Sequence, residues 1–103
     1  SYILEPLQIH GIEMPDKFLS AVTKLVNSKR GQMLEVKHEE GQAEMEAKLP
    51  VAEMIGWSSD LRSATEGRGT SSLKDQSFEK VPASLQPEII RNIRSRKGLA
   101  ENQ

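Results

Sequence analysis

The chain is 103 residues long, 36% of them hydrophobic, with a formal net charge of −1 at pH 7 and no cysteine. This length suits one domain with a modest core. The net charge argues against a protein whose entire surface binds nucleic acid. The lack of cysteine excludes disulfides, thiolate nucleophiles and zinc ribbons, and no stretch approaches the ~20 apolar residues of a membrane-spanning helix. Residues 1–10 also lack a signal-peptide pattern, so we expect a soluble, cytoplasmic protein with no membrane partner.

The first strand is predicted between Leu7 and Met14, where apolar and polar side chains alternate. The apolar positions are odd-numbered before Gly11 and even-numbered after it. Because one extra residue in a strand shifts the alternation by one, we expect a β-bulge at Gly11.

A helix is predicted to begin at Pro15 and Asp16, since proline suits the first helical position and an acidic side chain suits the positive end of the helix dipole. Apolar residues then recur on one helical face at Phe18, Leu19, Val22, Leu25 and Val26. Lys29 and Arg30 stand at the negative end of the dipole, and Gly31 is expected to adopt the left-handed conformation that ends a helix.

Two strands joined by a tight turn are predicted next. The first includes residues 34–36, and the second covers residues 43–49, where apolar and polar positions alternate. Glu40-Gly41 is the predicted hairpin turn because glycine tolerates a positive φ. The alternation also predicts one buried and one exposed face for the second strand.

The remaining chain is predicted to form a helix, an edge strand and a further helix. Apolar residues at helical spacing run from Val51 to Ala64, and Gly67 ends this pattern. Residues 68–81 are assigned to an edge strand, although few of their side chains are large and apolar. After Pro82, one helical face is formed by Leu85, Ile89, Ile90 and Ile93. We therefore divide the chain into a domain of residues 1–82 and a C-terminal helix and tail of residues 83–103.

The order strand, helix, strand, strand, helix, strand describes an α+β fold, the ferredoxin-like split βαββαβ sandwich. We expect a four-stranded antiparallel sheet with two helices on one face. The C-terminal helix is an addition to this unit.

The stretch "SATEGRGTSS", residues 63–72, is rich in glycine like a phosphate-binding loop, but its position in the predicted fold does not suit that function. A phosphate loop leads from a strand into a helix, whose N-terminal amides and positive dipole end attract the anion. Here the glycines follow a helix, so the loop faces unsatisfied carbonyls and the negative dipole end. The sequence also contains no Gly-Lys-Ser or Gly-Lys-Thr. We interpret the stretch as a helix end whose functional content lies in the side chains of Arg62 and Arg68.

Several strings of the sequence together resemble one protein family: "LEPLQIHGIEMP", "AVTKLVNSKRGQ", "AKLPVAEMIGWSSDLRSATEGRG", "FEKVP" and the closing "IRNIRSRKGL". They are similar, in this order, to the last domain of the ribosomal translocases, called elongation factor G in bacteria and elongation factor 2 in archaea and eukaryotes. The closing string resembles archaeal tails. The stretch "TSSLKDQS" is more polar than its bacterial counterpart, which favours an archaeal type or a related paralogue.

The resemblance implies a fragment of a larger translation factor. In that family the P-loop that binds GTP with Mg lies in the first domain, and the modified histidine lies in the domain before the last. It therefore implies no catalytic, cofactor-binding or metal site in this chain, and neither His10 nor His38 corresponds to the modified histidine. The last domain docks on rRNA and stalk-base proteins of the large ribosomal subunit and contacts the other domains of the factor during translocation of tRNA and mRNA.

The candidate rRNA-binding residues are Lys29, Arg30, Arg62 and Arg68. Each has a structural alternative. Lys29 and Arg30 can instead compensate the helix dipole. Arg62 and Arg68 can instead form ion pairs with acids such as Asp60 or Glu66. The arginines after residue 90 are expected on a solvated face or against the other domains.

Other functions leave weaker signs in the sequence. Trp57 can stack on a base, but on a helix it is more typical of a buried anchor. His10 and His38 lack a second ligand at metal spacing, and adjacent Glu39-Glu40 side chains point to opposite faces and form no catalytic pair.

Two other classes of protein stay open as alternatives. A stand-alone RNA-binding module shares the expected fold, but it would present exposed aromatic side chains on its central strands. An acylphosphatase-like hydrolase would need an anion loop with an arginine after the first strand, where Asp16 stands instead.

Overall fold

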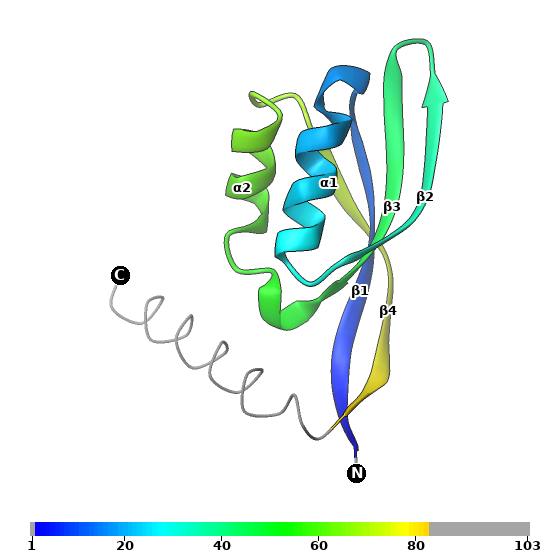
Figure 1. Ribbon diagram of the computed structural model, residues 1–103, viewed down its shortest axis with the longest axis vertical. Helices are drawn as coiled ribbons and strands as arrows, with labels where there is room; N and C mark the ends of the chain where they lie inside the picture. Colours follow the sequence, from blue (N-terminus) through cyan, green and yellow to red (C-terminus); the bar gives the residue numbers. More distant parts are fainter. Residues whose placement is uncertain (1, 83–103) are drawn as a thin grey trace, which may run out of the picture.

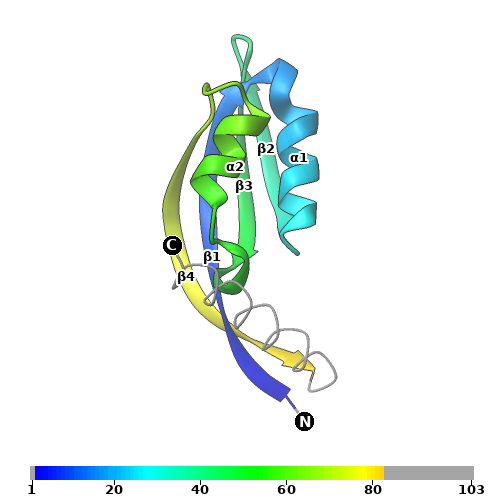
Figure 2. The ribbon, with the colours of Figure 1, turned by 90° about the vertical axis from the view of Figure 1, so that its left-hand side faces the viewer.

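The computed structural model describes residues 2–82, which form a four-stranded antiparallel sheet with both helices on one face (Figures 1 and 2). The strands, in the spatial order β2-β3-β1-β4, are β1 (Tyr2–Pro15), β2 (Gln32–Glu39), β3 (Gln42–Pro50) and β4 (Thr70–Pro82). The helices are α1 (Leu19–Ser28) and α2 (Trp57–Ala64), with short 3-10 turns before them at η1 (Asp16–Phe18) and η2 (Val51–Glu53). This confirms the predicted α+β, ferredoxin-like fold. The predicted C-terminal helix, residues 83–103, lies outside the described residues, so the division at residue 82 stays a prediction.

The core lies between the helices and the sheet. β3 alternates as predicted, and its buried side chains are Ala43, Met45, Ala47 and Leu49. They pack with residues of β1, α1 and α2, namely Ile12, Met14, Val22, Val26, Trp57 and Leu61. Helices of 10 and 8 residues are marginal on their own, so this packing is what holds α1 and α2 in place.

The hairpin between β2 and β3 is confirmed. Glu39 pairs with Gln42, which leaves the two-residue turn Glu40-Gly41. The φ angles of the two turn residues are 49° and 80°, and two positive values match the twist of the flanking strands.

The bulge lies in a different place from the predicted one. β1 pairs with β3 without a register shift along their whole shared length, including Gly11. The register between β1 and β4 shifts between Ile9 and His10, where Lys74 is the extra residue of β4. The prediction of a bulge at Gly11 was therefore wrong. The buried positions of β1 change from odd to even numbers between Leu7 and His10, and the apolar residues did not show this because the polar His10 takes the first buried position after the change.

Two helix predictions also need correction. The predicted helix from Val51 to Ala64 is divided, because Gly56 has a φ of 80° and separates η2 from α2. The left-handed residue after α1 is Arg30, with a φ of 56°, and not Gly31. Glycine is needed at position 31 because a side chain does not fit there: a Cβ would lie 2.6 Å from Leu49 Cδ2.

Candidate functional site

Lys29 is the first of the predicted rRNA-binding residues, and its charge is already paired within the fold. It follows α1 directly, is 8% exposed, and its Nζ lies 2.8 Å from Asp60 Oδ2 in α2. The ion pair joins the two helices. A phosphate would have to displace Asp60 to reach this ammonium group, so Lys29 has a structural role that differs from the predicted compensation of the helix dipole.

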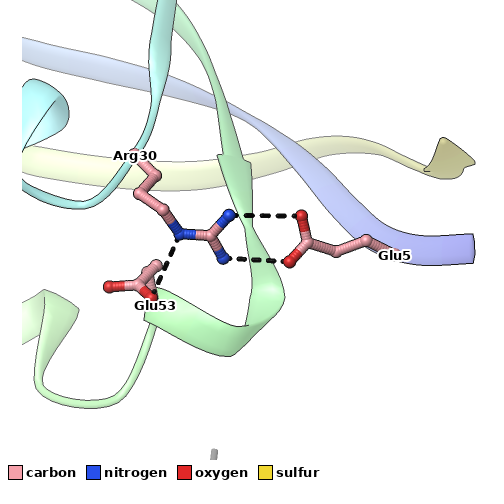
Figure 3. Close-up of polar contacts among 3 residues, drawn as sticks. All are labelled: Glu5, Arg30 and Glu53. Atoms are coloured by element: carbon pink, nitrogen blue, oxygen red, sulfur yellow. Dashed lines mark hydrogen bonds and ion pairs between the residues drawn. The ribbon is translucent and has the colours of Figure 1, made fainter. Parts of the chain in front are cut away.

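Arg30 bridges two buried carboxylates (Figure 3). Its two terminal nitrogens face Glu5 of β1, with Nη2 at 2.9 Å from Oε2 and Nη1 at 3.5 Å from Oε1. Its Nε lies 3.4 Å from Glu53 Oε2 in η2. Glu5 and Glu53 are 5% and 4% exposed, respectively. The hydrogen bond with Glu5 raises the pKa of Arg30 above its ordinary value, so the guanidinium is a permanent charge at this position.

The three residues of this cluster come from distant parts of the chain. Arg30 is 25 residues from Glu5 and 23 from Glu53. No local spacing in the sequence links them, so sequence analysis missed Glu5 and Glu53. The Arg30 side chain is 38% exposed, and its planar, two-point pairing with a buried carboxylate is a geometry that arginine favours. The ion pairs of Arg30 connect the turn after α1 to Glu5 in the outer half of β1 and to Glu53 in η2.

Arg62 and Arg68 differ from Lys29 and Arg30 because they have no acidic partner within residues 2–82. Both are exposed, and neither side chain forms an ion pair or hydrogen bond within residues 2–82. The predicted alternative, a pair with Asp60 or Glu66, was wrong for both arginines, and Asp60 is already bound to Lys29.

The loop that carries Arg68 is held by short hydrogen bonds. The Thr65 hydroxyl donates to the Leu61 carbonyl at 2.8 Å and accepts from the Gly69 amide at 2.8 Å. The Arg68 amide donates to the Thr65 carbonyl at 3.0 Å. Thr65 is fully buried. The stretch is a helix end, as predicted, and its backbone offers a rigid support for the two exposed guanidinium groups.

Arg68 and the turn that carries Lys29 and Arg30 lie at opposite ends of the helical layer, whereas Arg62 lies within α2, two residues after Asp60, the partner of Lys29. The connection from α2 to β4 lies at the same end as the β2–β3 hairpin and η1, whereas the turn from α1 to β2 lies at the far end (Figure 1). The fold therefore separates Arg68 from Lys29 and Arg30.

Trp57 and His10 belong to a partly buried polar cluster. Trp57 is 4% exposed, and its Nε1 donates to Ser71 Oγ at 3.0 Å. His10 Nδ1 lies 2.9 Å from the same hydroxyl, and its Nε2 lies 2.9 Å from Gln8 Oε1. Burial lowers the pKa of His10 below its ordinary value. Trp57 is therefore the expected anchor and offers no face for a base.

The exposed side of the sheet does not resemble an RNA platform. A hollow of about 720 Å³ near the hairpin is lined by Glu13, Lys37, His38, Glu39, Glu40, Gln42, Ala43 and Glu44. Four carboxylates against one lysine repel phosphate. The central strand β3 has no aromatic residue, and β1 has only Tyr2 at its outer end.

No group of three or more metal-binding side chains occurs in residues 2–82. His38 forms a surface pair with Asp16, with Nδ1 at 2.9 Å from Oδ1. The helices of the described region are too short and too polar to cross a membrane.

Comparison with known proteins assigns this chain to a family. Residues 2–89 match the family described as elongation factor G C-terminus. The chain belongs to this elongation factor domain family. A relative named elongation factor 2 from Nanoarchaeum equitans is 47% identical over 97 residues, which are 94% of this chain and 13% of the relative. Elongation factor 2 from Methanopyrus kandleri is 41% identical over 99 residues, 96% of this chain and 8% of the relative.

The elongation factor resemblance stated from the sequence is thus confirmed, including its archaeal type. The chain spans only 13% and 8% of the length of these two relatives. A crystal structure of a protein from Thermus thermophilus superimposes with a TM-score of 0.74 at 24% identity, covering 92% of this chain and 14% of that one. That likeness supports the fold.

Proposed function

We propose that this chain is the ribosome-docking C-terminal domain of a GTP-dependent elongation factor that drives translocation of tRNA and mRNA. The family match over residues 2–89 and the archaeal elongation factor 2 relatives carry this proposal. GTP and Mg would be bound by another domain of the full-length cytoplasmic factor, and this domain would contribute binding and positioning. Its partners would be rRNA and stalk-base proteins of the large subunit together with the other domains.

Within this domain, Arg62 and Arg68 are the residues that we propose contact rRNA phosphates. Both guanidinium groups are exposed and unpaired within residues 2–82, and both flank a loop held by the buried Thr65. A free guanidinium on a rigid support binds phosphate without first giving up an acidic partner. Lys29 and Arg30 are proposed to serve the fold, because their acidic partners already hold them.

The test uses the full-length factor with Arg62→Ala and Arg68→Ala combined. We expect the ribosome concentration that gives half-maximal GTP hydrolysis to rise about tenfold, which corresponds to about 1.4 kcal/mol. Binding of GTP to the free factor should not change, since the two arginines lie in the C-terminal domain. Ribosome binding by the variant should also depend less steeply on salt concentration, because fewer counterions are released when fewer phosphates are contacted.

The matched control is Lys37→Ala with Lys74→Ala, which also removes two exposed cations that have no ion pair within residues 2–82. This control should behave like the unmodified factor. An unchanged half-maximal ribosome concentration in the folded Arg62/Arg68 variant would remove both arginines from the docking surface.

A further inference from the structure

The connection from α2 to β4 contains a residue in an unfavourable backbone conformation. Glu66 and Gly67 are both left-handed, with φ angles of 53° and 81°, and Glu66 is not a glycine. A residue with a Cβ is disfavoured in this region, so it stays there only where neighbouring groups hold it. Arg68 follows directly, and the position of its guanidinium therefore depends on what holds this connection.

The Thr65 side chain joins both ends of the connection. Its hydroxyl donates to the Leu61 carbonyl in α2 and accepts from the Gly69 amide just before β4, each at 2.8 Å. The Thr65 carbonyl accepts from the Arg68 amide at 3.0 Å. One buried residue thus fixes the chain before and after the left-handed pair.

Gly69 is shaped to receive this threonine. A Cβ on Gly69 would lie 2.8 Å from both Oγ1 and Cγ2 of Thr65, closer than real Cβ contacts allow. The φ of Gly69 is not positive, so glycine is needed here for space and not for its conformational freedom. Gly67, in contrast, would meet no atom within 4 Å. The threonine and Gly69 therefore fit each other as a pair beneath an open loop.

The backbone of the connection has little else to offer an anion. The amides of Gly67, Arg68 and Gly69 donate to the Arg62 carbonyl, the Thr65 carbonyl and the Thr65 hydroxyl, respectively. Phosphate is therefore left with side chains, and the placement of Arg68 is what this connection contributes to binding.

We propose that Thr65, fitted against Gly69, is a positioning residue that holds Arg68 ready for an rRNA phosphate. This inference rests on the proposed function, in which Arg68 contacts rRNA. Thr65 is fully buried, so it acts through Arg68 and not by touching RNA. When the competent conformation is populated only part of the time, the apparent dissociation constant rises by the reciprocal of that fraction.

The test uses the full-length factor with Thr65→Val, which keeps the shape of the side chain and removes both of its hydrogen bonds. The readout is the ribosome concentration that gives half-maximal GTP hydrolysis, measured with Arg68 present and with Arg68→Ala. We expect about a threefold rise where Arg68 is present. No further rise should occur in the Arg68→Ala factor, because two residues that act through one contact are not additive. Thr65→Ser retains the hydroxyl and should restore the value of the unmodified factor.

The matched control is Thr23→Val in α1. The Thr23 hydroxyl donates to the Leu19 carbonyl at 2.9 Å, which is the same bond within a helix, but Thr23 supports no loop that carries a candidate arginine. Its replacement should leave the half-maximal ribosome concentration unchanged, with circular dichroism and GTP binding as checks on folding.

Gly69→Ala disturbs the pair from the other side and tests the proposal independently if Thr65→Val does not fold. Its Cβ displaces the threonine side chain while leaving the hydroxyl in the chain, and we expect the same Arg68-dependent rise.

Two results would overturn this inference alone, provided that Arg68→Ala by itself weakens binding. The first is no rise with either replacement, and the second is an equal rise with and without Arg68, which indicates a purely structural role. An unchanged value for Arg68→Ala would instead remove the proposed rRNA contact, and this inference with it.

Discussion

The turns after α1 and α2 end their helices in a similar way, but the cations near them differ in whether they have an acidic partner. Arg30 after α1 and Glu66 after α2 have φ angles of 56° and 53°. The Gly31 amide donates to the Val26 carbonyl at 2.9 Å, and the Gly67 amide donates to the Arg62 carbonyl at 2.8 Å, each across five residues. Both turns therefore satisfy the last carbonyls of their helix in the same way.

The difference arises outside the turns. The cations after α1 reach carboxylates of β1, η2 and α2, whereas Arg62 and Arg68 reach none within the described residues. A basic residue at a helix end thus reveals little about function by its position. What decides is whether another part of the fold supplies an acidic partner.

The largest expected effect comes from removing Arg30. Arg30→Ala leaves Glu5 and Glu53 buried without this guanidinium. Because the Arg30 side chain is itself 38% exposed, we expect a loss of about 2.5 kcal/mol, below the range for breaking a fully buried ion pair. Arg62→Ala should change the free energy of unfolding by less than about 0.5 kcal/mol, as for an ordinary surface substitution. Urea denaturation of the two variants measures both values. Similar stabilities would abolish the distinction between the two turns.

A smaller effect is expected from the glycines that follow the two helices. Gly31→Ala places a Cβ at 2.6 Å from Leu49 Cδ2 and 2.9 Å from the Val26 carbonyl oxygen. We expect this crowding to cost about 2 kcal/mol. Gly67→Ala meets no atom within 4 Å and is opposed only by the φ of 81°. That strain is about 1 kcal/mol, so a Gly67 variant less stable than the Gly31 variant would contradict this account.

The pH dependence of the free energy of unfolding also distinguishes the two regions, because the buried His10 lies beside Trp57 of α2. His10 contacts Ser71 and Gln8, and its ring centroid lies 6.2 Å from that of Trp57. Its pKa in the folded state is below 6.5, so the unfolded chain binds a proton first as the pH falls. The contribution of His10 is fully present above pH 6.5 and is lost as the pH falls toward the lower folded pKa.

The comparison is between the unmodified chain and His10→Gln, each unfolded in urea at about pH 7.5 and about pH 5.5, on either side of the ordinary histidine pKa. The unmodified chain should lose more stability on acidification than the variant. Other groups titrate equally in both chains, so parallel losses would show that His10 does not contribute.

Most of the fold could be predicted from residues close together in the sequence. The Glu40-Gly41 turn, the alternation of β3 and the apolar stripe of α1 each depend on spacing within one element, and each was confirmed. The errors concern the pairing between strands and the conformation of single residues, including Gly56, which divides the second predicted helix. The extra residue of the β1–β4 pair is Lys74, and the left-handed residue after α1 is Arg30.

The candidate site was predicted only in part for a related reason. All four cations were recognisable, and so was the helix end at Gly67. The acidic partners of Arg30, however, lie 23 and 25 residues away in the sequence, and only folding brings them within reach. For Lys29 the partner is Asp60, which the sequence had suggested as a partner of Arg62 instead.

By itself, the sequence determined the kinds and order of the elements and the family, because hydrophobic period, turn chemistry and motif strings are local properties. The tertiary structure alone decided which cations are neutralised and which face of β1 and β4 stays exposed. Charge pairing and burial depend on groups that folding brings together from distant positions, and their energies appear only when those groups meet.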